Sequence, residues 1–138
     1  MPIHIFNTQA QNRLPSAQIK KLIRGIADAE SSLKIGNVSV IFMDGRSMRA
    51  LNKKFLRHDY VTDVISFDLS SQTSLEGEIY VCFEQAAKQA KEYKVPVSNE
   101  LLRLVAHGML HILGYDDRSQ KQRNAMLSLG DRYISKLK

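Results

Sequence analysis

Hydrophobic residues follow two different spacings along the chain, one typical of strands and one typical of helices. Short apolar runs, partly β-branched, predict strands near residues 3–7, 38–43, 63–69 and 77–83. Apolar residues spaced three and four apart predict helices near residues 16–27, 44–55, 84–93, 99–113 and 119–137. A short polar segment joins the last two strands, so we expect them to form an antiparallel hairpin.

These elements follow one another in the order β-α-β-α-β-β-α-α-α. This order favours an α+β fold, in which about five helices pack on a single mixed sheet of about four strands. The chain has 138 residues and contains no repeat, low-complexity tract or linker long enough to divide it. We therefore expect one domain over residues 1–138, large enough to bury a hydrophobic core without disulfides.

Several residues mark where the predicted helices begin and end. Ser16 and Ser98 stand near prolines at the start of two periodic segments and can cap those helices. Either Asp44 or Ser47 can cap the helix near residues 44–55 in the same way. Gly114 is expected to end the helix near residues 99–113, because glycine readily adopts the left-handed conformation that terminates many helices.

The segment from Leu101 to Asp117, LLRLVAHGMLHILGYDD, predicts a metal site. His107 and His111 are four residues apart within the predicted helix, so their side chains leave the same face one turn apart. Gly114 then lets the chain turn, and Asp117 can return to offer an oxygen ligand. Two histidines, a carboxylate and one position left for water form the ligand set of a catalytic zinc site.

The position of the two histidines on the helix supports this interpretation. At about 100° per residue, most apolar residues of the segment, among them Met109 and Leu110, fall on one broad arc. His107 and His111 fall roughly opposite that arc, so we expect them to face away from the main core, as an open site requires. The alternative is that the two histidines are packed or exposed without any metal.

The full spacing, H-x-x-x-H-x-x-G-x-x-D, has the geometry of the zinc signature H-E-x-x-H-x-x-G-x-x-H and predicts a zincin-like metal helix. Gly108 occupies the position of the glutamate general base in that signature. Because glycine can neither accept a proton nor orient a water, the sequence argues against ordinary peptide hydrolysis. Asp116 is a candidate for handling protons, and Tyr115 is expected to pack or to form a hydrogen bond.

Lysine and arginine outnumber aspartate and glutamate by 20 to 14, which gives a formal net charge of +6. A basic excess favours anionic partners such as nucleic acid, although many proteins are basic for solubility alone. The densest basic cluster lies near residues 46–57 and includes Lys53, Lys54 and Arg57. These side chains are candidates for contacts with phosphate groups. The alternative is a charged solvent face.

Cys82 is the only cysteine, so no internal disulfide is possible, and a reducing compartment such as the cytoplasm is expected. The N-terminal residues lack the basic and apolar regions of a signal peptide. No apolar run approaches the roughly 20 residues that span a bilayer, so we expect no membrane partner.

The run H-G-M-L-H-I-L-G-Y-D resembles the signature H-G-x-L-H-L-x-G-Y-D-H of the YbeY family of bacterial metal-dependent endoribonucleases. Three upstream blocks are similar to blocks of that family in the same order. They are L-N from Leu51, T-D-V-I-S-F from Thr62 to Phe67, and G-E-I from Gly77 to Ile79. With the alanine-rich segment Q-A-A-K-Q-A, the resemblance extends from about Leu51 to the C-terminus.

The resemblance implies a zinc-dependent endoribonuclease for single-stranded RNA, with one zinc ion held by His107, His111 and Asp117. It implies a role in ribosomal RNA maturation, at the 3′ end of the small-subunit RNA, and in ribosome quality control. Ribosomal RNA and ribosomal particles would be the partners, and Arg57 and the neighbouring lysines would steer the RNA backbone. Two alternatives stay open: a non-catalytic, metal-containing ribosome assembly factor, and a metallohydrolase of another substrate class.

The chain departs from the family pattern near the expected site. Asp117 stands where the family has a histidine, and a carboxylate there would lower the positive charge of the metal site. An arginine of the family aligns with Leu56, so either Arg57 takes over the phosphate-facing role or that role is absent. Asp68 replaces a proline, and Glu78 replaces an aspartate.

Overall fold

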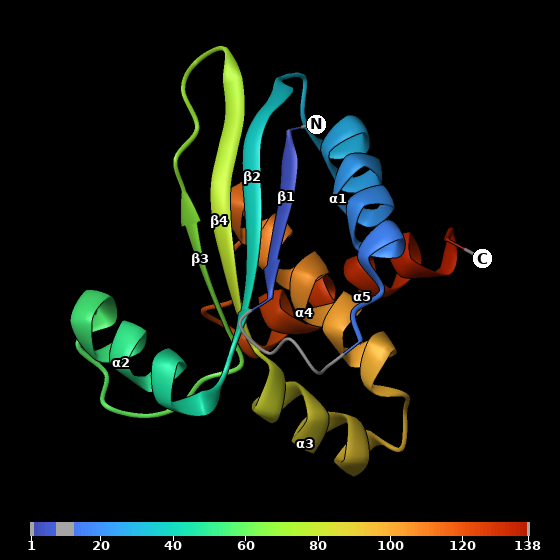
Figure 1. Cartoon of the computed structure of the whole chain (residues 1–138). Coiled ribbons are helices and arrows are strands. Elements are labelled where there is room, and N and C mark those ends of the chain that lie inside the picture. Colours follow the sequence, from blue (N-terminus) through green and yellow to red (C-terminus); the bar gives the residue numbers. More distant parts are fainter. Residues whose placement is uncertain (1, 8–12, 138) are drawn as a thin grey trace.

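The computed structural model describes residues 2–7 and 13–137, which form four strands and five helices (Figure 1). The strands are β1 (Ile3–Asn7), β2 (Lys34–Met43), β3 (Val64–Asp68) and β4 (Ser74–Cys82). The helices are α1 (Ser16–Glu30), α2 (Gly45–Leu56), α3 (Phe83–Tyr93), α4 (Val97–Ile112) and α5 (Gln120–Ser135). The α+β class and the order of elements are confirmed. No helix in these residues is both long enough and apolar enough to cross a membrane.

The strands form one mixed sheet in the order β1-β2-β4-β3. β1 and β4 each run parallel to β2, whereas β3 runs antiparallel to β4, so the predicted hairpin is confirmed. β3 is therefore an edge strand. α4 packs across β3 and β4, which places the end of that helix beside this edge.

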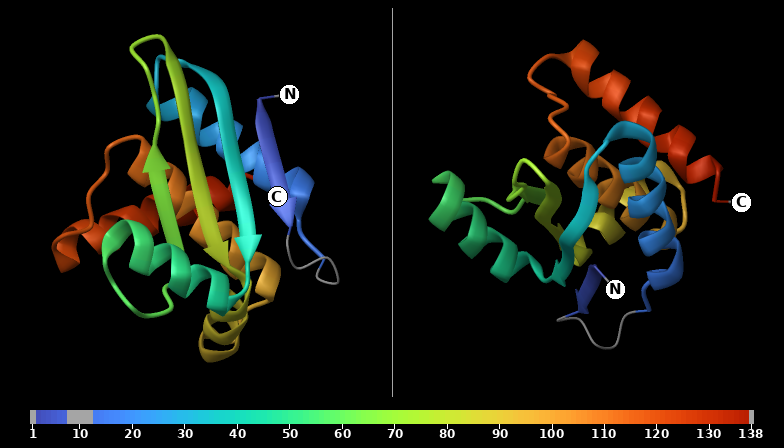
Figure 2. Two further views of the ribbon diagram at one scale, coloured as in Figure 1. Left: turned by 60° about the vertical axis from the view of Figure 1, so that its left-hand side comes forward. Right: turned by 90° about the horizontal axis from the view of Figure 1, so that it is seen from above.

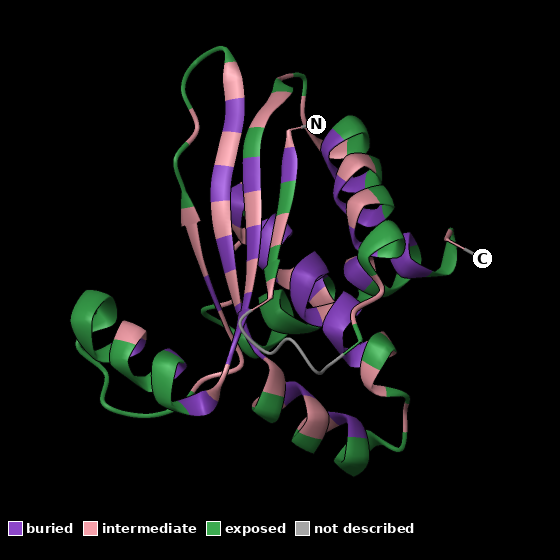
Figure 3. Cartoon of the chain, viewed as in Figure 1, coloured by how far each residue is buried: buried purple, intermediate pink, exposed green. Residues whose placement is uncertain are grey.

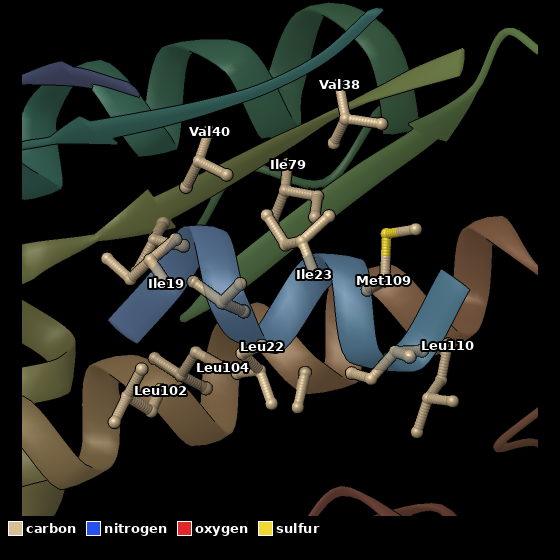
Figure 4. Close-up of a cluster of buried hydrophobic side chains, with 14 of the residues drawn as sticks. Ile19, Leu22, Ile23, Val38, Val40, Ile79, Leu102, Leu104, Met109 and Leu110 are labelled. Atoms are coloured by element: carbon tan, nitrogen blue, oxygen red, sulfur yellow. The ribbon is translucent and has the colours of Figure 1, made fainter. Parts of the chain in front are cut away.

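Helices cover the two faces of the sheet unequally (Figures 1 and 2). α1, α4 and α5 lie on one face, where Ile23, Val40, Ile79 and Leu110 belong to the main hydrophobic core (Figure 4). α2 lies on the opposite face over a smaller buried cluster of Met43, Met48, Ile65 and Cys82. α4 is buried on nearly all sides, whereas most of α2 is exposed (Figure 3).

A glycine allows α4 to approach the sheet closely. A Cβ atom on Gly108 would lie 2.7 Å from Cγ2 of Ile79 and 3.4 Å from Cγ2 of Val64. Ile79 is fully buried, so its side chain has little room to move. Gly108 therefore sets the distance between the sheet and the turn of α4 that carries the histidines.

Two of the predicted helix caps are wrong. α1 follows Pro15 and α4 follows Pro96, and neither helix has a side-chain cap, so Ser16 and Ser98 do not serve as caps. The fixed φ of proline directs the chain into both helices without a capping hydroxyl. At α2 the cap is Asp44, whose carboxylate accepts a backbone N–H at 2.7 Å.

The strand predicted near residues 38–43 is longer in the structure. β2 begins at Lys34, and Gly36 lies inside it at a register irregularity against β4. A Cβ atom on Gly36 would lie 2.1 Å from Oγ of Ser74. The glycine thus permits close contact between strands rather than ending the strand.

Candidate metal centre

The C-terminus of α4 turns the chain back toward the helix. Gly114 has a φ of 98°, a conformation that favours glycine. Its N–H donates to the carbonyl of His111 at 3.0 Å, and the N–H of Tyr115 donates to the carbonyl of Leu110 at 3.0 Å. These are the two bonds of a Schellman motif, and the prediction that Gly114 ends the helix is confirmed. The turn places Asp117 against the last two turns of α4.

His107, His111 and Asp117 converge on one point. The Nε2 atoms of the two histidines are 3.2 Å apart, and each lies 3.3 Å from Oδ2 of Asp117. Ligand atoms placed tetrahedrally around an ion at about 2.0–2.1 Å are themselves separated by about 3.3 Å. The three side chains therefore fit a single metal ion, and we call them the metal group. Among the residues that the structure describes, no other cluster of three such side chains is found.

The two histidines differ in exposure. The His111 side chain is 30% exposed, but that of His107 is only 10% exposed, because α5 packs along the same side of α4. The expectation that both histidines face away from the core is therefore wrong for His107. The metal group lies partly inside the protein, with His111 toward solvent.

Burial and neighbouring charge set the protonation of the group. Burial, and then the nearby His111, lower the pKa of His107 below its ordinary value. Burial raises the pKa of Asp117, but the charges and hydrogen bonds of the His111 and His107 imidazoles lower it by more. The pKa of Asp117 therefore lies below its ordinary value. Near neutral pH His107 is therefore neutral and Asp117 is ionised, which are the forms that bind metal.

One polar atom of the group lacks a protein partner. Nδ1 of His107 is buried, and it neither donates a hydrogen bond to the described residues nor accepts one from them. An imidazole that binds metal through Nε2 carries its proton on Nδ1 and usually donates it. A cavity of about 90 Å³ lined by His107, Asp63 and Glu100 has room for a water that could accept that proton.

Glu30, at the end of α1, holds the turn that carries Asp117. Its carboxylate accepts hydrogen bonds from the hydroxyls of Tyr115 and Tyr133. These bonds lower the pKa of Glu30, while burial and Glu30 together raise the pKa of Tyr133 to about 12. The carboxylate therefore stays ionised, and it joins the turn after α4 to both α1 and α5.

The metal group lines an open cavity of about 570 Å³. The lining comes from α2 and the segment after it, from β3, and from the ends of α4 and α5. Its residues are Asn52, Leu56, His58, Tyr60, Thr62, Asp63, Val64, Ile65, Ser66, Asp68, His107, His111, Ile112, Asp117 and Arg123. An open cavity beside three ligands is suited to a substrate rather than to a closed structural metal.

Sequence reasoning missed Arg123. Its guanidinium lies 3.9 Å from Oδ2 of Asp117 and lines the cavity. The local signal was present, because Ser119 and Gln122 form a capping box that starts α5 and puts Arg123 near its first turn. This turn faces the histidines because of the way α5 packs against α4. The sequence pattern does not reveal that packing.

Other predicted site residues lie outside the cavity lining. Lys53 and Lys54 are exposed on the last turn of α2, and Arg57 follows as its left-handed C-cap with a φ of 59°. Asp116 pairs with Arg118, with 3.0 Å between its Oδ2 and the arginine Nε.

Comparison with known proteins decides the family. A sequence model of the endoribonuclease YbeY matches residues 4–138. The chain belongs to the YbeY family. An endoribonuclease YbeY of Chlorobium phaeovibrioides is 39% identical over 134 residues, which cover 97% of this chain and 89% of that protein. An endoribonuclease YbeY of Chlorobaculum parvum is 33% identical over 138 residues, covering 100% and 96%.

A solved structure supports the same fold. The solution structure of a Thermotoga maritima protein superposes with a TM-score of 0.65 at 28% sequence identity. The match covers 98% of this chain and 88% of that one. In this YbeY domain, Leu56 lines the cavity at the position where the resemblance places an arginine, and Arg57 does not. The guanidinium in the lining belongs to Arg123, on a different helix.

Proposed function

We propose that this protein is a zinc-dependent endoribonuclease that hydrolyses phosphodiester bonds in single-stranded RNA. The observation that carries the proposal is the convergence of His107, His111 and Asp117 within an open cavity, in a chain of the YbeY family. Its proposed setting is the cytoplasm, where it acts on ribosomal RNA, including the 3′ end of the small-subunit RNA, and on ribosomal particles in quality control.

The donor set supports zinc. Imidazole nitrogen and carboxylate oxygen are both zinc ligands, and three protein ligands leave the fourth position for water or substrate, as catalytic sites require. When bound there, zinc lowers the pKa of water toward about 7 and stabilises negative charge on phosphate oxygen. The small separations between the three donor atoms mean that little rearrangement of side chains is needed to hold the ion.

Residues of the protein hold the ion and bind the substrate. His107 and His111 fix two ligand positions from a rigid helix, and Asp117 completes the set from the turn held by Glu30. Arg123 is placed to contact a phosphate oxygen beside the metal group, because its guanidinium is half-exposed within the cavity lining. Asp116 stays a predicted proton-handling residue, although its carboxylate is engaged by Arg118.

The basic end of α2 is proposed to steer the RNA. Lys53, Lys54 and Arg57 are exposed on the segment that leads into the cavity. They lie outside the cavity lining, so we expect them to attract the phosphate backbone toward the site rather than to contact the reacting phosphate.

Metal analysis and RNA cleavage on the purified protein test the proposed function. We expect close to one zinc ion per chain and cleavage of an unstructured RNA, but little cleavage of an RNA duplex. A chelator should remove the metal and the cleavage together, and added zinc should restore both. Protein that carries no metal yet cleaves RNA, or that carries zinc but cleaves no RNA, would contradict the proposal.

Replacing Arg123 with alanine should weaken RNA binding through the loss of one phosphate contact. The slope of log affinity against log salt concentration should become less steep by about 0.7, the value for one contact to single-stranded nucleic acid. Lys121→Ala removes an exposed charge from the same helix and serves as the matched control. Bound zinc is measured in both variants, since Arg123 also lies near Asp117. An unchanged slope in Arg123→Ala would argue against the contact.

A further inference from the structure

Large apolar side chains are exposed at the C-terminal end of α2 and in the segment that follows it. Phe55, Leu56, Tyr60 and Val61 each expose between 41% and 54% of their surface. They fall within seven residues and make up half of the exposed large hydrophobics in the described part of the chain. Exposed apolar groups gathered in this way mark interaction sites. We call residues 55–61 the aromatic shelf.

The aromatic shelf and the metal group share one cavity. Leu56, His58 and Tyr60 line the cavity of about 570 Å³ that His107 and His111 also line. A molecule that occupies this cavity can therefore contact both the shelf and the metal group. The shelf is part of the route to the proposed reaction centre.

The shelf is held in place before any ligand arrives. The rings of His58 and Tyr60 stack with their centroids 5.3 Å apart and only 14° between their planes. The buried Asn52 donates from Nδ2 to the Tyr60 carbonyl at 3.0 Å, and Nε of Arg49 pairs with Asp59 at 2.7 Å. Binding to such a pre-ordered surface costs little conformational entropy.

The charge around the shelf identifies the kind of partner. Lys53, Lys54 and Arg57 precede or interrupt the exposed rings, and all three are exposed. Aromatic rings interleaved with cations bind single-stranded nucleic acids, because bases stack on the rings while phosphates contact the cations. An apolar protein surface would match the rings but would leave these charges without partners.

We propose that Tyr60, whose ring stacks on that of His58, also stacks against a nucleobase of the RNA. A phosphate of the same RNA strand would enter the cavity that the metal group lines. This proposal rests on the proposed function and adds a base-binding subsite to it. In a duplex the bases are already stacked on each other, so only an unpaired base can occupy the shelf. Because every base has a π-face, the subsite would select single strands with little preference for sequence.

A tryptophan at position 60 provides a direct probe, because the chain contains no other tryptophan. Tyr60→Trp should show quenched fluorescence when a short single-stranded RNA is added in the presence of chelator, which prevents cleavage. An oligonucleotide of the same length without bases should cause no quenching. Tyr93→Trp, at an exposed tyrosine on α3, is the matched control and should not respond to either.

Affinity measurements separate stacking from other roles of Tyr60. Tyr60→Ala should weaken binding of single-stranded RNA by about 5- to 150-fold, the range for loss of one base–aromatic stack. Tyr60→Phe keeps the ring and should bind within about twofold of the wild type, because phenylalanine stacks on bases as tyrosine does. Circular dichroism should show both variants folded, since the side chain is more than half exposed.

The outcomes distinguish this proposal from the proposed function. Wild type that cleaves RNA while Tyr60→Ala binds it equally well overturns the subsite, as expected if the shelf instead binds a protein. Quenching at position 60 and weaker binding by Tyr60→Ala support the subsite even if the wild type proves unable to cleave. Wild type that binds no RNA at all overturns both proposals.

Discussion

Replacing His111 with alanine is expected to lower zinc affinity and RNA cleavage together, each by at least about 100-fold. Loss of a residue that merely orients a metal ligand costs about 10- to 100-fold, and loss of a ligand should cost more. The remaining pair, His107 and Asp117, leaves too few protein ligands for a catalytic zinc site. Competition against a chromogenic chelator measures the affinity, and single-turnover cleavage of a labelled RNA measures the activity.

His4→Ala is the matched control for this substitution. It also removes one imidazole, but from an exposed side chain on β1 that hydrogen-bonds to Asn37 at 3.2 Å. We expect wild-type zinc content and cleavage in this variant. His111 is partly exposed, so its loss should leave the fold intact, which circular dichroism can verify. A His111→Ala protein with full zinc content would show that the ion is held elsewhere.

Replacing Gly108 with valine is expected to lower the free energy of unfolding by about 3 kcal/mol, the upper part of the range for overpacking a core. A first side-chain atom already falls 2.7 Å from a methyl group of the buried Ile79, and valine adds two more. α4 would have to move away from the sheet, carrying His107 and His111 with it. We therefore expect weaker zinc binding in addition to lower stability.

Gly25→Val makes the same substitution in the middle of an exposed helix surface. No atom lies within 4 Å of the Cβ position at Gly25. Valine and glycine differ modestly in helix propensity, so stability should change by less than about 0.5 kcal/mol. Urea unfolding of the two variants gives the comparison. Equal stability of Gly108→Val and wild type would mean that α4 can stand farther from β4 than the structure shows.

Features governed by local spacing could be predicted from the sequence. The period of an α-helix places His107 and His111 one turn apart wherever the helix lies, and Gly114 favours the turn that ends it. The hairpin of β3 and β4 likewise follows from two strand patterns with a short polar connection. These inferences need only a few consecutive residues, and the structure agrees with them.

Features governed by packing between distant elements could not be predicted in this way. The burial of His107 and the place of Arg123 both depend on how α5 lies against α4, and no local pattern specifies that contact. Gly108 shows the difference, because from the sequence alone it indicates only the absence of a catalytic base. The structure gives a steric reason for the same glycine, since any side chain there would collide with Ile79.

The bonds made by Glu30 have a consequence for the position of Asp117. The turn that presents Asp117 is held through Tyr115 by a carboxylate from α1, and the same carboxylate accepts a bond from Tyr133 near the end of α5. The place of the third candidate ligand therefore depends on two helices that contribute no ligand themselves. A substitution that loosens α1 or α5 would disturb the three side chains without touching any of them.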